Sequence, residues 1–211
     1  MYFGERAILA SRNDTMDTIN MAVTENMPGE KVTLLSTDSA DINDADGLHT
    51  IPAEYLHSLN PSGLPPSQLE LKVGAPIMLL RNIDPARGLC NGTRLIVVHI
   101  GQYMLRVRLA NKPDALIELI PRFTLSTLES DMPFMLTKKQ FTVKLCFPMA
   151  INKSQGQSLK YVGVGLRHPP FMHGQLYVTL SRVTSLSGVS ILLPENINTT
   201  NNVVYSELLL N

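Results

Sequence analysis

Residues 141–183 constrain the fold most, because their pattern changes from that of a strand to that of a polar turn and then to that of a helix. FTVKLCF (141–147) alternates apolar and other side chains with the period of two typical of a β-strand. A polar cluster, NKSQGQS (152–158), follows, then a short strand, YVGVGL (161–166), and a helical segment, HGQLYVTLSRV (173–183). This succession, with a lone arginine on the helix, is the layout of phosphate-handling α/β domains.

Composition sets the outer limits. A chain of 211 residues holds one large domain or two small ones, and 44% hydrophobic with 17% charged residues is a globular composition. The formal net charge is zero, so the overall electrostatic field of the chain neither indicates nor excludes binding of nucleic acid. Cys90 and Cys146 lack CxxC or Cys/His spacing, so we expect reduced thiols of an intracellular protein, with no disulfides and no zinc site.

The ends and the hydropathy add three expectations. No apolar run approaches the roughly 18 residues of a membrane span, so no membrane partner is expected. The N-terminus lacks a signal-peptide pattern. Because the chain starts almost directly on a strand, we also expect an upstream part to be missing.

The first third predicts a strand–helix–strand unit. RAILAS (6–11) is a short apolar strand, and an amphipathic helix begins near Asn13 or Asp14 and ends at Pro28 and Gly29. KVTLLS (31–36) is the next strand. Short connections between these elements predict a βαβ unit and a parallel sheet.

The middle of the chain changes character. TDSADINDADG (37–47) is acidic and predicts a loop or domain junction; its ligand spacing and the lack of a closing Glu argue against a calcium loop. Several short strands follow, with a hairpin turn at Gly101 and Gln102, and they predict a small β-barrel inserted into the α/β domain. In YMLRVRLA (103–110), Arg106 and Arg108 lie opposite the apolar face, as the solvent-facing residues of an edge strand commonly do.

The last third completes the α/β domain. Helical spacing predicts that Leu176, Leu180 and Val183 face the sheet. Gln175, Thr179 and Arg182 share another face, where an arginine is suited to bidentate phosphate contact. From the residues alone, two interpretations stay open: the 153–157 turn is a solvated cap or a phosphate-binding turn, and Arg182 is an ion-pair partner or a phosphate ligand.

Four segments carry a resemblance to a known family: ERAILASRNDTMDTIN, LKVGAPIMLLRNIDPARGLCNGTRLIV, KLCFPMAINKSQGQSL and HGQLYVTLSRVTS. Together they resemble the C-terminal half of the Pif family of superfamily 1 DNA helicases, in particular the Helitron-related branch that is abundant in plants. The resemblance implies that residues 1–45 and 141–211 form the second RecA-like domain. It also implies that residues 46–140 form the small inserted barrel of the family.

Site residues follow from the resemblance, motif by motif. It implies that Arg182 is the arginine finger on the γ-phosphate of ATP, and that Lys153 and Ser154 contact DNA. From the charged face of the 103–110 strand we also expect Arg106 and Arg108 to contact DNA. The nucleotide-binding residues that the resemblance implies are Arg12, Asn13, Gln155, Gly156, Gln175 and Tyr177. No metal ligand is expected in this chain.

Two departures from the family pattern matter. Pro148 and Ala150 stand where a small residue and a Thr are expected, so a backbone donor and a hydroxyl are lost and we expect weaker coupling to DNA. No stretch of the 211 residues matches GxxxxGK[ST], and no apolar strand ends in the Asp-Glu pair that would hold magnesium. We therefore expect ATP and Mg to be bound only in the complete helicase, and this chain alone to be inactive.

Three hypotheses about function result. The first is a C-terminal part of a 5′-to-3′ ATP-dependent DNA helicase, whose partners are single-stranded DNA and the missing N-terminal RecA-like domain. The second is a non-catalytic module that binds single-stranded DNA or a helicase partner, and the third is a non-functional transposon remnant. The resemblance also implies residence in the nucleus and work in DNA repair, recombination and telomere maintenance.

Overall fold

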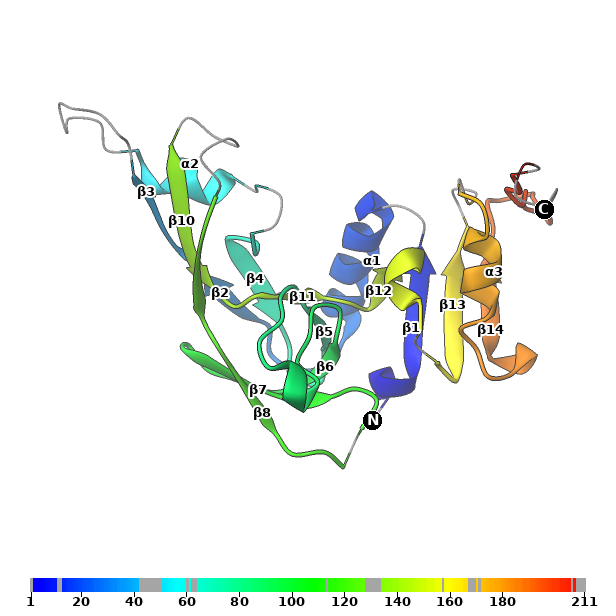
Figure 1. The fold of residues 1–211 in the computed structure, drawn as a ribbon, viewed down its shortest axis with the longest axis horizontal. Coiled ribbons are helices and arrows are strands. Elements are labelled where there is room, and N and C mark those ends of the chain that lie inside the picture. The colour runs from blue at the N-terminus through cyan, green and yellow to red at the C-terminus, as the bar shows by residue number, and fades with distance from the viewer. Residues whose placement is uncertain are drawn as a thin grey trace. The chain divides into compact units, whose positions relative to one another are not determined.

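The computed structural model describes residues 2–10, 13–41, 51–59, 61, 64–112, 114–127, 134–156, 158–166, 170, 172–205 and 207. The chain forms two compact units (Figure 1). Unit 1 comprises Met1–Met27 and Cys146–Asn211, and unit 2 comprises Pro28–Leu145. Unit 2 thus interrupts unit 1 along the chain, between residues 27 and 146.

Unit 1 is built on a four-stranded parallel sheet in the order β12-β1-β13-β14. Its strands are β1 (Arg6–Ala10), β12 (Pro148–Ala150), β13 (Tyr161–Gly165) and β14 (Val189–Leu192). The α-helices are α1 (Asn13–Asn26) and α3 (Gln175–Leu180), and the 3-10 turns are η1 (Tyr2–Glu5), η3 (Ile151–Ser154) and η4 (Leu186–Gly188). The predicted α/β class with a parallel sheet is confirmed here.

Burial explains why the central strands read as continuous apolar runs. Leu9 and Ala10 of β1 are fully buried, as are Val162 and Val164 of β13. Such central strands of a parallel sheet are apolar where the faces of the sheet are covered. Figure 1 shows β1 between β12 and β13.

Unit 2 consists mainly of antiparallel strands in three sheets. The largest has the order β11-β5-β6-β7-β8, from β5 (Pro76–Leu79), β6 (Arg94–Ile100), β7 (Met104–Leu109), β8 (Glu118–Pro121) and β11 (Val143–Leu145). A three-stranded sheet joins β3 (Thr37–Asp41), β10 (Met135–Gln140) and β9 (Phe123–Ser126), and β2 (Val32–Leu35) pairs with β4 (Gln68–Leu71). Helix α2 (Ala53–Ser58) and the turn η2 (Pro85–Arg87) complete the unit.

One apolar core joins two of these sheets. Leu34, Leu69 and Leu71 of the β2–β4 pair pack in the same cluster as the inward residues of the five-stranded sheet. The hairpin predicted at Gly101 and Gln102 is confirmed, since the Gly101 amide donates to the Met104 carbonyl oxygen at 3.1 Å. Closure of these strands into a barrel is not confirmed, because the pairings among the described residues give three separate sheets.

The predicted βαβ unit in the first third is wrong. The strand after α1, β2, pairs antiparallel with β4, whereas the parallel neighbours of β1 are β12 and β13 from the last third of the chain. Periodicity identifies the elements, but it carries no information about a partner more than a hundred residues away. Residues 37–41, predicted as loop, form β3 because they pair with β10.

Two other local predictions are wrong. The strand predicted over residues 141–147 is shorter: Val143–Leu145 is β11, which pairs with β5 in unit 2, and β12 starts at Pro148 in unit 1. On α3 the polar face is the buried one, since Gln175 and Thr179 are buried while Leu180 is exposed. Thr179 tolerates burial because its hydroxyl donates to the Gln175 carbonyl oxygen at 2.8 Å.

Candidate functional site

The carboxyl edge of the unit 1 sheet is the edge at which α/β sheets bind ligands. Within unit 1 the chain passes from β1 to β12 on one side and from β13 to β14 on the other. The carboxyl ends of β1 and β13 therefore flank a topological switch point, the usual ligand position in an open parallel sheet. Helix α1 begins after β1 at this edge, and η3 begins directly after β12.

The η3 turn presents part of the predicted motif to solvent. Lys153, Gln155 and Gly156 are exposed. Gly156 has a φ of 78°, a left-handed conformation that glycine adopts without strain. A cation followed by a sharp turn places positive charge at a point that a phosphate can approach closely.

Ser154 has an internal role in the same turn. Its side chain is fully buried, and its hydroxyl donates to the Ile151 carbonyl oxygen at 2.6 Å. The one proton of the hydroxyl is thus already used within η3. The hydroxyl stabilises the backbone that carries Lys153 and does not face solvent.

Arg182 lies just beyond the end of α3. Its Nε donates to the Val178 carbonyl oxygen at 2.9 Å, and its Nη2 donates to the Ser181 hydroxyl at 2.6 Å. These bonds hold the guanidinium plane against the last turn of the helix. Tyr177 on the same helix is 75% exposed, whereas Gln175 is buried.

Two sets of contacts bring the η3 turn and the arginine-bearing helix together. Helix α3 packs against η3. Beyond the helix, the Leu159 amide donates to the Arg182 carbonyl oxygen at 2.9 Å, and the Thr184 amide donates to the Leu159 carbonyl oxygen at 3.2 Å. Lys153 and Arg182 therefore belong to one locally fixed assembly in unit 1.

The structure says less about the positions of the other predicted site residues. Arg12 lies outside the described residues, and Asn13 is the first residue of α1 at the carboxyl end of β1, with its side chain outside the description. Arg106 and Arg108 lie on β7 in unit 2. The structure thus assigns the predicted residues to two different units.

The amino edge of the same sheet is closed by internal pairs. The Arg6 guanidinium lies 4.1 Å from the centre of the Tyr2 ring and 4.3 Å from that of the Tyr161 ring. Lys160 Nζ lies 2.6 Å from Glu5 Oε1, and this bond lowers the pKa of Glu5. These cations have partners within the protein.

Unit 2 holds a buried charged cluster that the sequence signals only weakly. Lys138 Nζ is fully buried; it donates to Ser67 Oγ at 2.7 Å and lies 3.6 Å from Asp38 Oδ2. Gln140 Nε2 donates to the Leu34 carbonyl oxygen at 3.0 Å. The signal is the alternation of β10, where Lys138 and Gln140 share the inward face with Leu136.

The described residues show no metal-binding group of three or more His, Cys, Asp or Glu side chains. Cys90 and Cys146 are free thiols. Within the same residues, no helix is long and apolar enough to cross a membrane.

Known proteins match this chain in sequence. Residues 54–100 match the family model described as the 2B domain of the DNA helicase Pif1. The ATP-dependent DNA helicase PIF1 of Rattus norvegicus is 38% identical over 127 residues, which cover 59% of this chain and 19% of the rat protein. The PIF1 helicase of Xenopus laevis is 29% identical over 193 residues, covering 87% of this chain and 27% of the relative.

A solved structure matches as well. The Pif1 helicase of Candida albicans superposes with a TM-score of 0.65 at 25% identity, over 92% of this chain and 46% of that one. The chain thus spans roughly a fifth to a quarter of the curated relatives named above. The family model, the curated relatives and the solved structure together relate this chain to part of a Pif1-family DNA helicase.

Proposed function

We propose that the chain is the C-terminal part of an ATP-dependent 5′-to-3′ DNA helicase, to which it contributes contacts with single-stranded DNA and an arginine finger. The observation that carries this proposal is the packing of α3 on η3, which fixes Arg182 and Lys153 in one assembly. A related Pif1 helicase from Bacteroides, which shares the fold with a TM-score of 0.68 at 23% identity, has been solved in complex with ADP-AlF3 and single-stranded DNA.

In this proposal unit 1 is the second RecA-like motor domain and unit 2 is the inserted module of the family. The all-parallel sheet of unit 1 and the position of unit 2 between α1 and β12 support the assignment. Assignment to the Helitron-related plant branch, nuclear residence, and roles in repair, recombination and telomere maintenance rest on the sequence resemblance alone.

The roles proposed for the site residues follow their exposure. Lys153 pairs with a phosphate of single-stranded DNA, and the buried Ser154 hydroxyl holds the turn that positions Lys153. Gln155 and Gly156 continue the turn toward the nucleotide, together with Arg12, Asn13, Gln175 and Tyr177. The DNA contact predicted for Arg106 and Arg108 on unit 2 is not part of this proposal.

Phosphoryl transfer depends on positioning and on neutralising charge more than on covalent chemistry by the protein. When bound by the complete helicase, Mg-ATP supplies the phosphoryl group. Arg182 contributes a planar, permanently charged guanidinium, and its bonds to Val178 and Ser181 orient that plane. Movement of unit 1 as a whole would carry this charge toward or away from the nucleotide, which couples hydrolysis to domain motion.

The test is a chimera in which the Walker A and Walker B domain of a Pif1 helicase is fused upstream of this chain. We expect DNA-stimulated ATP hydrolysis, and Arg182→Ala should lower its kcat by about a thousandfold or more, as loss of an arginine finger does. Arg81→Ala, at an exposed arginine of unit 2, is the control and should leave kcat unchanged. Full kcat in the Arg182→Ala chimera would contradict the proposed finger.

A second candidate is a non-catalytic binder of single-stranded DNA. The exposed side chain of Lys153 on η3 is the observation that favours it. In that case the isolated chain binds single-stranded DNA, and Arg182→Ala has no effect in any ATPase assay.

A further inference from the structure

We propose that the outward face of the β7–β8 hairpin in unit 2 is a docking surface for an acidic, amphipathic helix of a protein partner. The β7–β8 face consists of Met104, Arg106, Arg108, Ile117 and Leu119. Alternate residues of a strand lie on one face, and Arg106 is directly opposite Leu119 in the register. The face is therefore one continuous surface of apolar and cationic side chains.

The two faces of the β7–β8 hairpin differ in burial. The opposite face of the hairpin supplies Leu105, Val107 and Ile120, which are fully buried in the main core of unit 2. The hairpin is thus anchored on its inner side. On the outer side, Met104 is 43%, Ile117 41% and Leu119 51% exposed. Contiguous exposed apolar side chains mark interaction surfaces.

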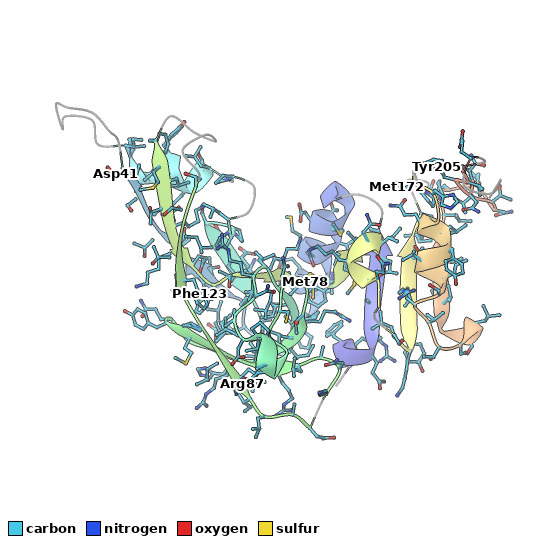
Figure 2. All side chains as sticks on the ribbon, in the orientation of Figure 1. Asp41, Met78, Arg87, Phe123, Met172 and Tyr205 are labelled. Atoms are coloured by element: carbon cyan, nitrogen blue, oxygen red, sulfur yellow. The ribbon has the colours of Figure 1, made fainter. Side chains whose placement is uncertain are left out.

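The positive charge of the β7–β8 face favours an acidic partner. Within the described β6, β7 and β8 strands, Glu118 is the one acidic residue, and it points inward. Its Oε2 lies 2.7 Å from Nη2 of Arg87, which is labelled in Figure 2. Two arginines therefore share the outer face with no carboxylate from these strands. A partner that brings Asp or Glu side chains complements this charge.

The make-up of the face favours protein over single-stranded DNA. Surfaces that bind single strands stack the bases on aromatic rings, and the β7–β8 face carries aliphatic side chains and Met104 instead. Met and Arg are enriched at protein interfaces, where Lys and Glu are depleted. A helix with an apolar stripe flanked by Glu matches apolar residues set between two arginines.

The test uses the 211-residue chain and a fluorescein-labelled peptide of about four helical turns, with a Leu stripe flanked by Glu. Anisotropy should show saturable binding, which Leu119→Asp or Arg106→Glu weakens by about tenfold or more, as for a central interface residue. Leu186→Asp, at an exposed leucine of unit 1, is the matched control and should bind like the wild type. Far-UV circular dichroism confirms that each variant is folded.

Three results would overturn the proposal. The first is equal binding of a peptide in which every Glu is replaced by Lys. The second is binding that Leu119→Asp leaves unchanged. The third is failure of the peptide to bind while a labelled oligo(dT) binds and Arg106→Glu abolishes that binding, which would assign the face to DNA.

Discussion

Lys138 is the residue whose environment differs most from what its chemistry leads one to expect. Its ammonium group is fully buried, beside Asp38 and Ser67. Removing one member of a buried ion pair leaves the other charge uncompensated. Lys138→Ala should therefore lower the free energy of unfolding by about 3–5 kcal/mol, measured by urea denaturation.

Lys139, the next residue, is the control for that prediction because it is exposed on the same strand. Lys139→Ala should change stability by less than about 0.5 kcal/mol. Equal effects of the two substitutions would show that the buried pair contributes nothing specific.

Substitutions at Ser154 and Lys153 should have different effects although the residues are neighbours: the first should lower stability, the second affinity for single-stranded DNA. Ser154→Ala removes an internal hydrogen bond, so it should cost about 1 kcal/mol of stability and leave affinity for single-stranded DNA within about twofold. The measurements are thermal unfolding and anisotropy with labelled oligo(dT). A Ser154→Ala chain of unchanged stability that binds DNA tenfold more weakly would show that the hydroxyl contacts DNA instead.

The same pair shows what residue identity can and cannot predict. The motif at 153–156 marks a functional turn, but it does not say which of its side chains faces inward. Ser154 points inward because η3 turns there and its hydroxyl finds the Ile151 carbonyl oxygen. That orientation depends on backbone geometry, which residue types alone do not specify.

At the scale of the elements, η4 packs closely against the start of β13. A Cβ atom at Gly188 would overlap the Lys160 carbonyl oxygen, a backbone atom that cannot move alone. Gly188→Ala should therefore destabilise the chain by about 1–3 kcal/mol, measured by urea denaturation. Ser187→Ala, one residue earlier and exposed, should cost less than half as much; equal costs would place the effect outside this contact.

Element types were more predictable than element partners. The period of two in residues 103–109 and the apolar run at 6–10 correctly predicted β7 and β1. The pairing of β1 with β12 and β13, and of β2 with β4, was not predictable, because sequence-distant strands meet through the packing of the whole core. The buried polar face of α3 was missed for the same reason, since α3 packs against η3.

At the scale of the molecule, unit 2 leaves unit 1 after Met27 and returns at Cys146, so the parallel sheet joins segments from both ends of the chain. The turn η3, which carries Lys153, and the helix α3, which precedes Arg182, both lie in the segment after unit 2. The resemblance to Pif helicases located the residues of this site in the sequence. Their contacts with each other required the folded chain.

The central claim is that the carboxyl edge of the unit 1 sheet binds single-stranded DNA through Lys153. The most direct measurement is the affinity of the 211-residue chain for labelled oligo(dT) by anisotropy over a series of salt concentrations. We expect affinity to fall with salt, and Lys153→Ala to weaken binding and to reduce the slope of log K against log salt by about 0.7, the value for one phosphate contact on a single strand. Lys160→Ala, at the opposite edge of the sheet, should leave the slope unchanged. No binding at low salt, or the same slope for Lys153→Ala and wild type, would contradict the claim.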